Sequence, residues 1–120
     1  MNWIIDFLIV FIALEHLFFL VFEMFLWDTL GKKIFRGALP AELFKPTRTL
    51  AANQGLYNGF LAAGLIWSLF ITNPEWNFNV ACFFLTCVSI AGIYGAFSAS
   101  KKIFFVQALP ALITLALLWI

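Results

Sequence analysis

The sequence has few charged residues, because Asp, Glu, Lys and Arg together fill only 11% of its 120 positions. A soluble domain usually has about 25% charged and about 45–50% apolar residues, whereas 64% of this chain is apolar. So short a chain has too little interior to hide that much apolar surface from water. A disordered chain is also excluded, because disorder needs low hydropathy and the mean hydropathy here is +1.01. The composition therefore indicates an integral membrane protein.

Other chemistry is scarce as well. The net charge of +1 provides no basic surface for nucleic acid, which we exclude as a partner. Cys82 and Cys87 lack the spacing of a redox pair, and we expect them to pack as small apolar side chains. The single histidine leaves no His-x-x-x-His or Glu-x-x-His pattern, so we predict no metal site and leave the cofactor open.

Four apolar stretches come close to the roughly 20 residues that a helix needs to cross a bilayer. They are apolar on every side, whereas the strands of a membrane barrel alternate between polar and apolar residues. We therefore predict an all-α polytopic membrane protein, a single domain over residues 1–120 with four transmembrane helices in a bundle. The spans are expected at about residues 3–27, 50–72, 78–97 and 103–120.

The basic residues predict the orientation of these spans, because cytoplasmic loops are enriched in Lys and Arg. All seven lie in the segment 28–49 or between the third and fourth spans, so both segments are expected in the cytoplasm and both termini outside. The first span contains Glu15 and His16 and has no basic leader, so we expect it to be retained rather than cleaved. The basic residues are Lys32, Lys33, Arg36, Lys45, Arg48, Lys101 and Lys102.

Apolar residues alternate with the basic ones in the segment 28–49. This amphipathic pattern predicts one or two short helices that lie at the membrane interface and contact anionic lipid. Pro40 suits the start of the second short helix, and Pro46 is expected to end it.

Polar residues inside the spans are the candidate site, because an ionisable group there costs at least about 2.5–3.5 kcal/mol. At about 1.5 Å per residue, Glu23 lies roughly 6 Å inside the cytoplasmic edge. The polar groups of all four spans fall in the cytoplasmic half, which predicts a polar pocket open to the cytoplasm or the inner leaflet. The candidate ligand- or proton-binding residues are Glu15, His16, Glu23, Asn53, Gln54, Tyr57, Asn58, Tyr94 and Gln107.

Helical geometry groups some of these residues on shared faces. At about 100° per residue, His16 and Glu23 point within about 20° of each other. Asn53, Gln54 and Tyr57 fall within about 100° on the second span, with Asn58 at the margin. One interpretation is a centre that exchanges protons near neutral pH. The other is a hydrogen-bonded polar core that joins the helices.

Small residues predict close helix contacts. Gly55 and Gly59 form a small-xxx-small pair, and Gly95 is spaced likewise from Ala91. We expect them to pack the second and third spans together, with a homodimer as the alternative. Pro110 is expected to kink the fourth span near Gln107, and Trp67 is expected to pack inside.

Several runs resemble the motifs of a known family, the domain of unknown function 1304. Ala-Leu-Glu-His at 13–16 with Glu-Met-Phe-Leu-Trp at 23–27 resembles the first motif, and the run 51–65 resembles the most specific one. The runs 91–95 and 107–110 resemble the third and fourth. The resemblance covers nearly the whole chain and implies a four-span protein of the bacterial inner (cytoplasmic) membrane. It implies no particular activity.

Three functions fit these residues. The first is binding or transport of a small molecule through the polar pocket, coupled to protons and carried out by a monomer or a homodimer. The second is an enzyme acting on a lipid or quinone-like substrate, with Glu23 or His16 as general base and Tyr57 or Tyr94 as general acid. The third is an accessory subunit of a membrane complex. No phosphate loop or cofactor fingerprint favours the enzyme, so that assignment stays open.

Overall fold

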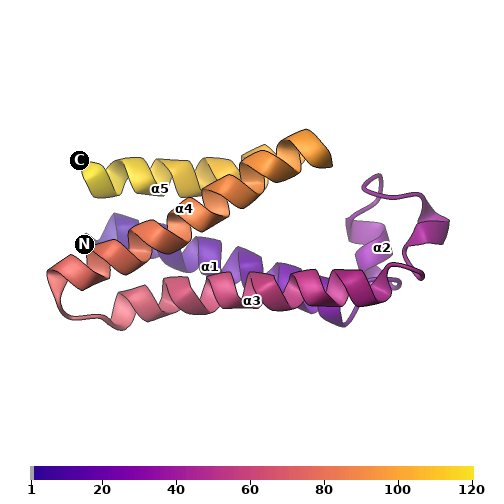
Figure 1. Cartoon of the computed structure of the whole chain (residues 1–120), viewed down its shortest axis with the longest axis horizontal. Coiled ribbons are helices and arrows are strands. Elements are labelled where there is room, and N and C mark those ends of the chain that lie inside the picture. Colours follow the sequence, from indigo (N-terminus) through magenta and orange to yellow (C-terminus); the bar gives the residue numbers. More distant parts are fainter. Residues whose placement is uncertain (1) are drawn as a thin grey trace. The chain divides into compact units, whose positions relative to one another are not determined.

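The computed structural model describes residues 2–120, and all regular structure in that range is helical. This confirms the all-α prediction; an isolated bridge between Arg36 and Leu39 is the sole β-type pairing in residues 2–120. Figure 1 shows the long helices and the loop that separates two of them. The elements are α1 (Trp3–Met24), α2 (Leu30–Ile34), η1 (Ala41–Leu43), α3 (Arg48–Phe70), α4 (Pro74–Ser98), the π-helical η2 (Phe104–Ala108) and α5 (Leu109–Trp119).

The chain forms two compact units. The split unit combines the chain up to Leu14 with Leu61–Ile120, and the loop unit is Glu15–Phe60. The boundaries at residues 14/15 and 60/61 fall inside α1 and α3, so each of these helices contributes to both units. The prediction of a single domain over residues 1–120 stays a prediction.

The core of the split unit is made of aliphatic side chains from α1, α3, α4 and α5. Buried hydroxyls in it bond within their own helix: Ser89 donates to the Leu85 carbonyl at 2.8 Å and Thr114 to that of Pro110 at 2.8 Å. Such local bonds let a polar side chain be buried without a distant partner. The core residues are Ile5, Ile9, Ile12, Ala13, Ala62, Leu65, Ala81, Leu85, Val88 and Ala111.

The turn between α3 and α4 is fixed by two asparagines. Asn73 caps α4 by accepting from the Trp76 backbone N–H at 3.1 Å, and Pro74 occupies the first turn, where its missing N–H costs nothing. The Asn77 amide donates to the Ser68 carbonyl near the end of α3 at 2.7 Å. Because of this cap, α4 begins at residue 74, four residues before the predicted span.

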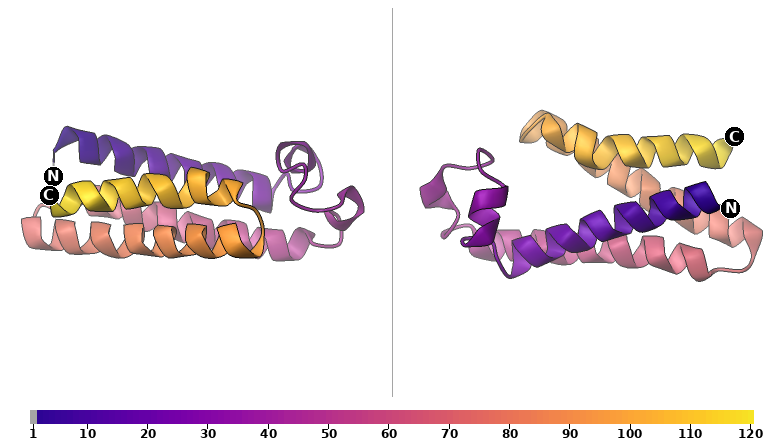
Figure 2. Two further views of the ribbon diagram at one scale, coloured as in Figure 1. Left: turned by 90° about the horizontal axis from the view of Figure 1, so that it is seen from above. Right: turned by 180° about the vertical axis from the view of Figure 1, so that it is seen from behind.

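Within the split unit, α4 and α5 lie side by side (Figure 2). A Cβ atom added to Gly92 would lie 2.5 Å from the Ala108 backbone nitrogen, so only glycine permits this approach. Beside this contact, the Leu109 N–H bonds to the Phe104 carbonyl in a π-helical turn directly before Pro110. Proline cannot continue the ordinary ladder, so the disturbance predicted near Gln107 takes the form of a π-helical segment.

The loop unit contains the second half of α1, the segment 25–47 and the first half of α3. The predicted short helices are present as α2 and η1, with Pro40 as the cap of η1. Trp27 joins the two ends of this segment: its indole N–H donates to Thr47 Oγ1 at 2.9 Å, and its ring lies 4.8 Å from that of Phe44. The interfacial position of these helices stays a prediction.

Two packing predictions were wrong. Trp67 is 56% exposed rather than packed inside. The close approach at Gly55 and Gly59 is to α1, because an added Cβ would meet Glu23 and Met24 at Gly55 and Leu20 at Gly59. Small residues mark a close contact, but they do not specify which helix makes it.

Candidate functional site

Glu23 is the centre of the polar site in the loop unit. Its side chain is buried, with 7% of the residue exposed, and both carboxylate oxygens accept hydrogen bonds from α3. Gln54 Nε2 donates to Oε2 at 3.0 Å, and Asn58 Nδ2 donates to Oε1 at 2.6 Å. Gln54 and Asn58 are four residues apart, so their side chains lie above one another on one helix face. The two amides therefore hold the carboxyl group from two adjacent turns.

The glycines of α3 bring the two helices close enough for these bonds. A Cβ added to Gly55 would lie 2.8 Å from Met24 Cγ and 3.0 Å from Glu23 Cβ. At Gly59 it would lie 2.5 Å from Leu20 Cδ1. Short amide side chains span the gap to a carboxylate only when the backbones are this near. The Gly-xxx-Gly pair is therefore part of the site, although it contributes no polar group.

Within residues 2–120, no Lys or Arg side chain forms an ion pair with Glu23. Arg48 pairs instead with Asp28, at 3.7 Å, outside the carboxyl site. An ionised carboxylate in apolar surroundings is costly unless it is paired or hydrogen-bonded, and two amide donors supply only part of what a counter-ion would. The site can thus take either a proton or a positively charged group.

Glu15 and His16 both lie about two turns before Glu23 on α1. His16 is fully buried, and its ring meets that of Phe19 edge-on at 5.5 Å between centroids. Glu15 is half-buried, and its Oε1 is buried without a hydrogen-bond partner among the described residues. In the same range, no three His, Cys, Asp or Glu side chains are grouped so that they could hold a metal ion.

The other predicted site residues are placed differently. Asn53 is exposed and Tyr57 is 61% exposed, because the face of α3 that meets α1 is the one carrying Gly55 and Asn58. In the split unit, Tyr94 is 72% exposed and Gln107 is half-buried within η2. Of the nine candidates, the structure joins Glu23, Gln54 and Asn58 by hydrogen bonds.

Comparison with known proteins identifies the family. The model described as "Protein of unknown function (DUF1304)" matches residues 10–119. The chain belongs to this family. A curated relative, "Uncharacterized protein YpaA" of Lactococcus lactis subsp. lactis (strain IL1403), is 26% identical over 105 residues, which make up 87% of each chain. No solved structure is significantly similar. The suspected family is confirmed, and neither description names an activity.

In this DUF1304 protein, sequence reasoning missed two hollows in the loop unit. One, of about 290 Å³, is lined by Met24, Phe25, Trp27, Asp28 and Arg48 at the end of α1. Its signal was the pair of opposite charges at the two ends of the segment 28–49. The other, of about 210 Å³, lies between α2 and η1, and the run of cations at 32–36 was its signal.

Proposed function

We propose that this protein spans the bacterial cytoplasmic membrane four times and exchanges protons for a small, positively charged molecule at Glu23. The observation that carries the proposal is the Glu23 carboxyl group, which is buried, held by two amide donors and without a basic partner in residues 2–120. An ionisable side chain in a membrane span is costly and is a functional candidate by default.

Helix lengths support the membrane location. α1 and α4 contain 22 and 25 residues and are long and apolar enough to cross a bilayer. α3 has 23 residues, and its polar start, with Arg48, Gln54 and Asn58, lowers its apolar character. The helical stretch Phe104–Trp119 is apolar but shorter. The proposal of four spans requires that α3 and the stretch Phe104–Trp119 also cross the membrane.

The split unit offers support for the topology. The start of α1, the turn between α3 and α4, and the end of α5 lie at one end of that unit, as Figure 2 lets the reader follow. These are the three segments without Lys or Arg, which the positive-inside rule assigns to the outside. An even number of spans with both termini on one side is consistent with this arrangement.

The chemistry of Glu23 favours a cation as the ligand. A neutral solute can donate a hydrogen bond to the carboxylate but leaves its charge uncancelled, and an anion would be repelled by it. A proton and an organic cation, by contrast, each cancel the buried charge, so binding of one disfavours the other. The Gln54 and Asn58 amides donate to the carboxylate and orient it in both cases. Competition of this kind is sufficient to couple solute movement to proton movement.

The enzyme alternative has no comparable support, because Tyr57 and Tyr94, its candidate general acids, are both more than half exposed. A homodimer stays a prediction.

The test is cation uptake into proteoliposomes with an acidic interior, using ethidium and benzyltrimethylammonium as probes. The wild-type protein should accumulate at least one of them faster than protein-free vesicles do. Glu23→Gln keeps the shape and removes the charge, so uptake should fall to the protein-free rate. Glu42→Gln, on the exposed η1, is the matched control and should behave as wild type. Wild-type uptake by Glu23→Gln, or no uptake of either probe by the wild type, would contradict the proposal.

A further inference from the structure

The hollow between α2 and η1 is lined by three cationic side chains. Lys32 and Lys33 come from α2, and Arg36 from the turn that follows it. The remaining lining groups are Gly37, Leu39, Ala41 and Phe44, so no carboxylate takes part. None of the three cations forms an ion pair with another side chain in the range 2–120. Three unpaired positive charges around one hollow favour an anionic ligand.

One lining residue of this hollow, Phe44, is tightly packed. Phe44 is 1% exposed, and its ring lies 4.8 Å from that of Trp27, whose indole N–H is held by Thr47. Gly37 adopts φ +91°, a left-handed conformation that turns the chain around the hollow. The volume of about 210 Å³ far exceeds the roughly 15 Å³ that one water molecule needs. A group as large as a phosphate ester therefore fits between the cations.

Apolar side chains on the same segment indicate where the ligand comes from. Leu30, Ile34 and Leu43 on α2 and η1 are each at least 42% exposed. Exposed aliphatic groups beside basic ones are typical of segments that lie at the headgroup level of a membrane. A hollow on a segment in that position would lie at the level of the lipid phosphates.

We propose that Lys32, Lys33 and Arg36 form a binding site for the phosphate group of an anionic phospholipid. Arg36 can hold two phosphate oxygens with its planar guanidinium, and the two lysines act as point charges. The site rests on the membrane location in the proposed function, but it does not involve Glu23. Lipid binding and cation exchange can therefore fail independently.

The test is native mass spectrometry of the full chain in mixed micelles with equal phosphatidylglycerol and phosphatidylcholine. The wild type should retain phosphatidylglycerol preferentially. Each basic residue near an anionic surface contributes about fivefold, so the triple variant Lys32→Gln, Lys33→Gln, Arg36→Gln should lose up to about a hundredfold of that preference. Equal retention of both lipids by the wild type, or an unchanged preference in the triple variant, would overturn the site.

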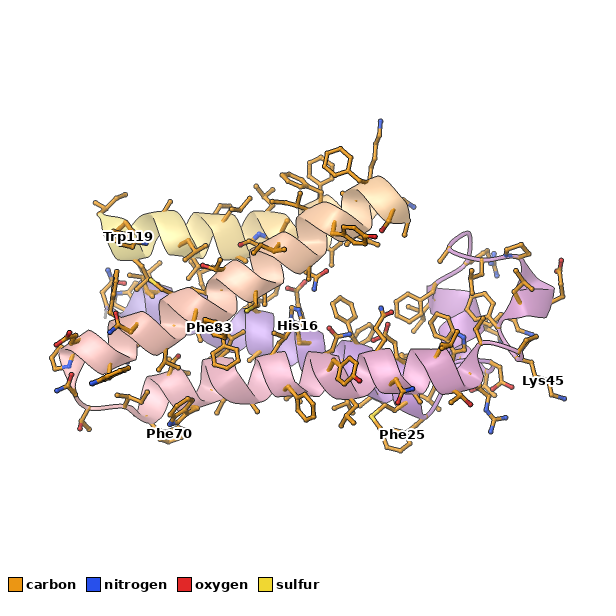
Figure 3. All side chains as sticks on the ribbon, viewed as in Figure 1. His16, Phe25, Lys45, Phe70, Phe83 and Trp119 are labelled. Carbon is orange, nitrogen blue, oxygen red and sulfur yellow. The ribbon has the colours of Figure 1, made fainter. Side chains whose placement is uncertain are left out.

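Three controls make the result specific. The variant Lys45→Gln, Lys101→Gln, Lys102→Gln also removes three charges, but none of these lysines lines the hollow, and Lys45 projects away from the loop (Figure 3). This control variant should keep the preference for phosphatidylglycerol. If it loses as much preference as the first triple variant, net charge alone explains the binding, and the proposed site is overturned. Glu23→Gln should also keep the preference, which separates this site from the proposed exchange.

Gly37→Ala leaves every charge in place but strains the turn, so it should weaken the preference; an unchanged preference would argue against a shaped site. A final arm adds inorganic phosphate to lipid-free protein. If the protein binds inorganic phosphate but does not selectively retain phosphatidylglycerol, the ligand is free phosphate and the proposed lipid site is overturned.

Discussion

Replacing Asn58 by leucine tests the bond that holds the buried carboxyl group. Leucine has a similar size and no donor, so Glu23 Oε1 loses the amide that lies 2.6 Å away. A hydrogen bond to a charged group is worth about 1.5–3 kcal/mol, and one between neutral groups about 0.5–1.5 kcal/mol. The unfolding free energy should therefore fall by about 1.5–3 kcal/mol when Glu23 is ionised and by about 0.5–1.5 kcal/mol when it is protonated.

The assay is unfolding by sodium dodecyl sulfate in detergent micelles, followed by circular dichroism at several pH values. Asn58→Leu should cost more at alkaline than at acidic pH, because the charged carboxylate depends more on its donor. In a Glu23→Gln background the pH dependence of this cost should vanish, because glutamine does not titrate. Together, the two single variants and the double variant form a double-mutant cycle that isolates the interaction between residues 23 and 58. Asn53→Leu, on the exposed face of α3, is the control. A cost equal to that of the control, or one independent of pH in the Glu23 background, would refute the reasoning.

Three further predictions concern packing and topology. Gly92→Leu should destabilise the protein by at least about 1–3 kcal/mol through overpacking, since its Cβ would meet the Ala108 backbone; the exposed neighbour variant Ala91→Leu should not, and equal unfolding midpoints would contradict the contact. Thr47→Val removes the acceptor of the Trp27 indole and should cost about 0.5–1.5 kcal/mol in the same assay; an unchanged midpoint would count against this bond. Alkaline phosphatase fused after Ile120 should be active and green fluorescent protein dark, whereas a bright fluorescent fusion would reverse the orientation.

The helical content was predictable because hydropathy and length act on whole segments. The helix ends were less so: the Asn73 cap and Pro74 start α4 earlier than its apolar residues suggest. Counting residues along each helix placed Glu23, Gln54 and Asn58 in the cytoplasmic half of their spans, but it did not pair Glu23 with Asn58. Their contact needed the close approach at Gly55, whose partner helix no local pattern specifies.

The part of the site that could not be predicted is the orientation of α3 about its own axis. That helix is apolar on most sides, so its sequence contains no strong stripe to mark an inner face. Asn53, Gln54 and Tyr57 were grouped by angle alone. All three are exposed, but of these Gln54 is the one whose amide donates to Glu23. The hollow lined by Arg36 was likewise missed, because loop conformation depends on single residues such as Gly37 rather than on periodicity.

The division of α1 and α3 between two units has a consequence for biosynthesis. The loop unit is one continuous stretch, Glu15–Phe60, whereas the split unit needs residues from both ends of the chain. At about 5–20 residues per second, the ribosome takes roughly 3–12 s to add the last 60 residues. The loop unit is complete in the nascent chain throughout that interval. Gln54 and Asn58, the amide partners of Glu23, are therefore already synthesised while α4 and α5 are still being translated.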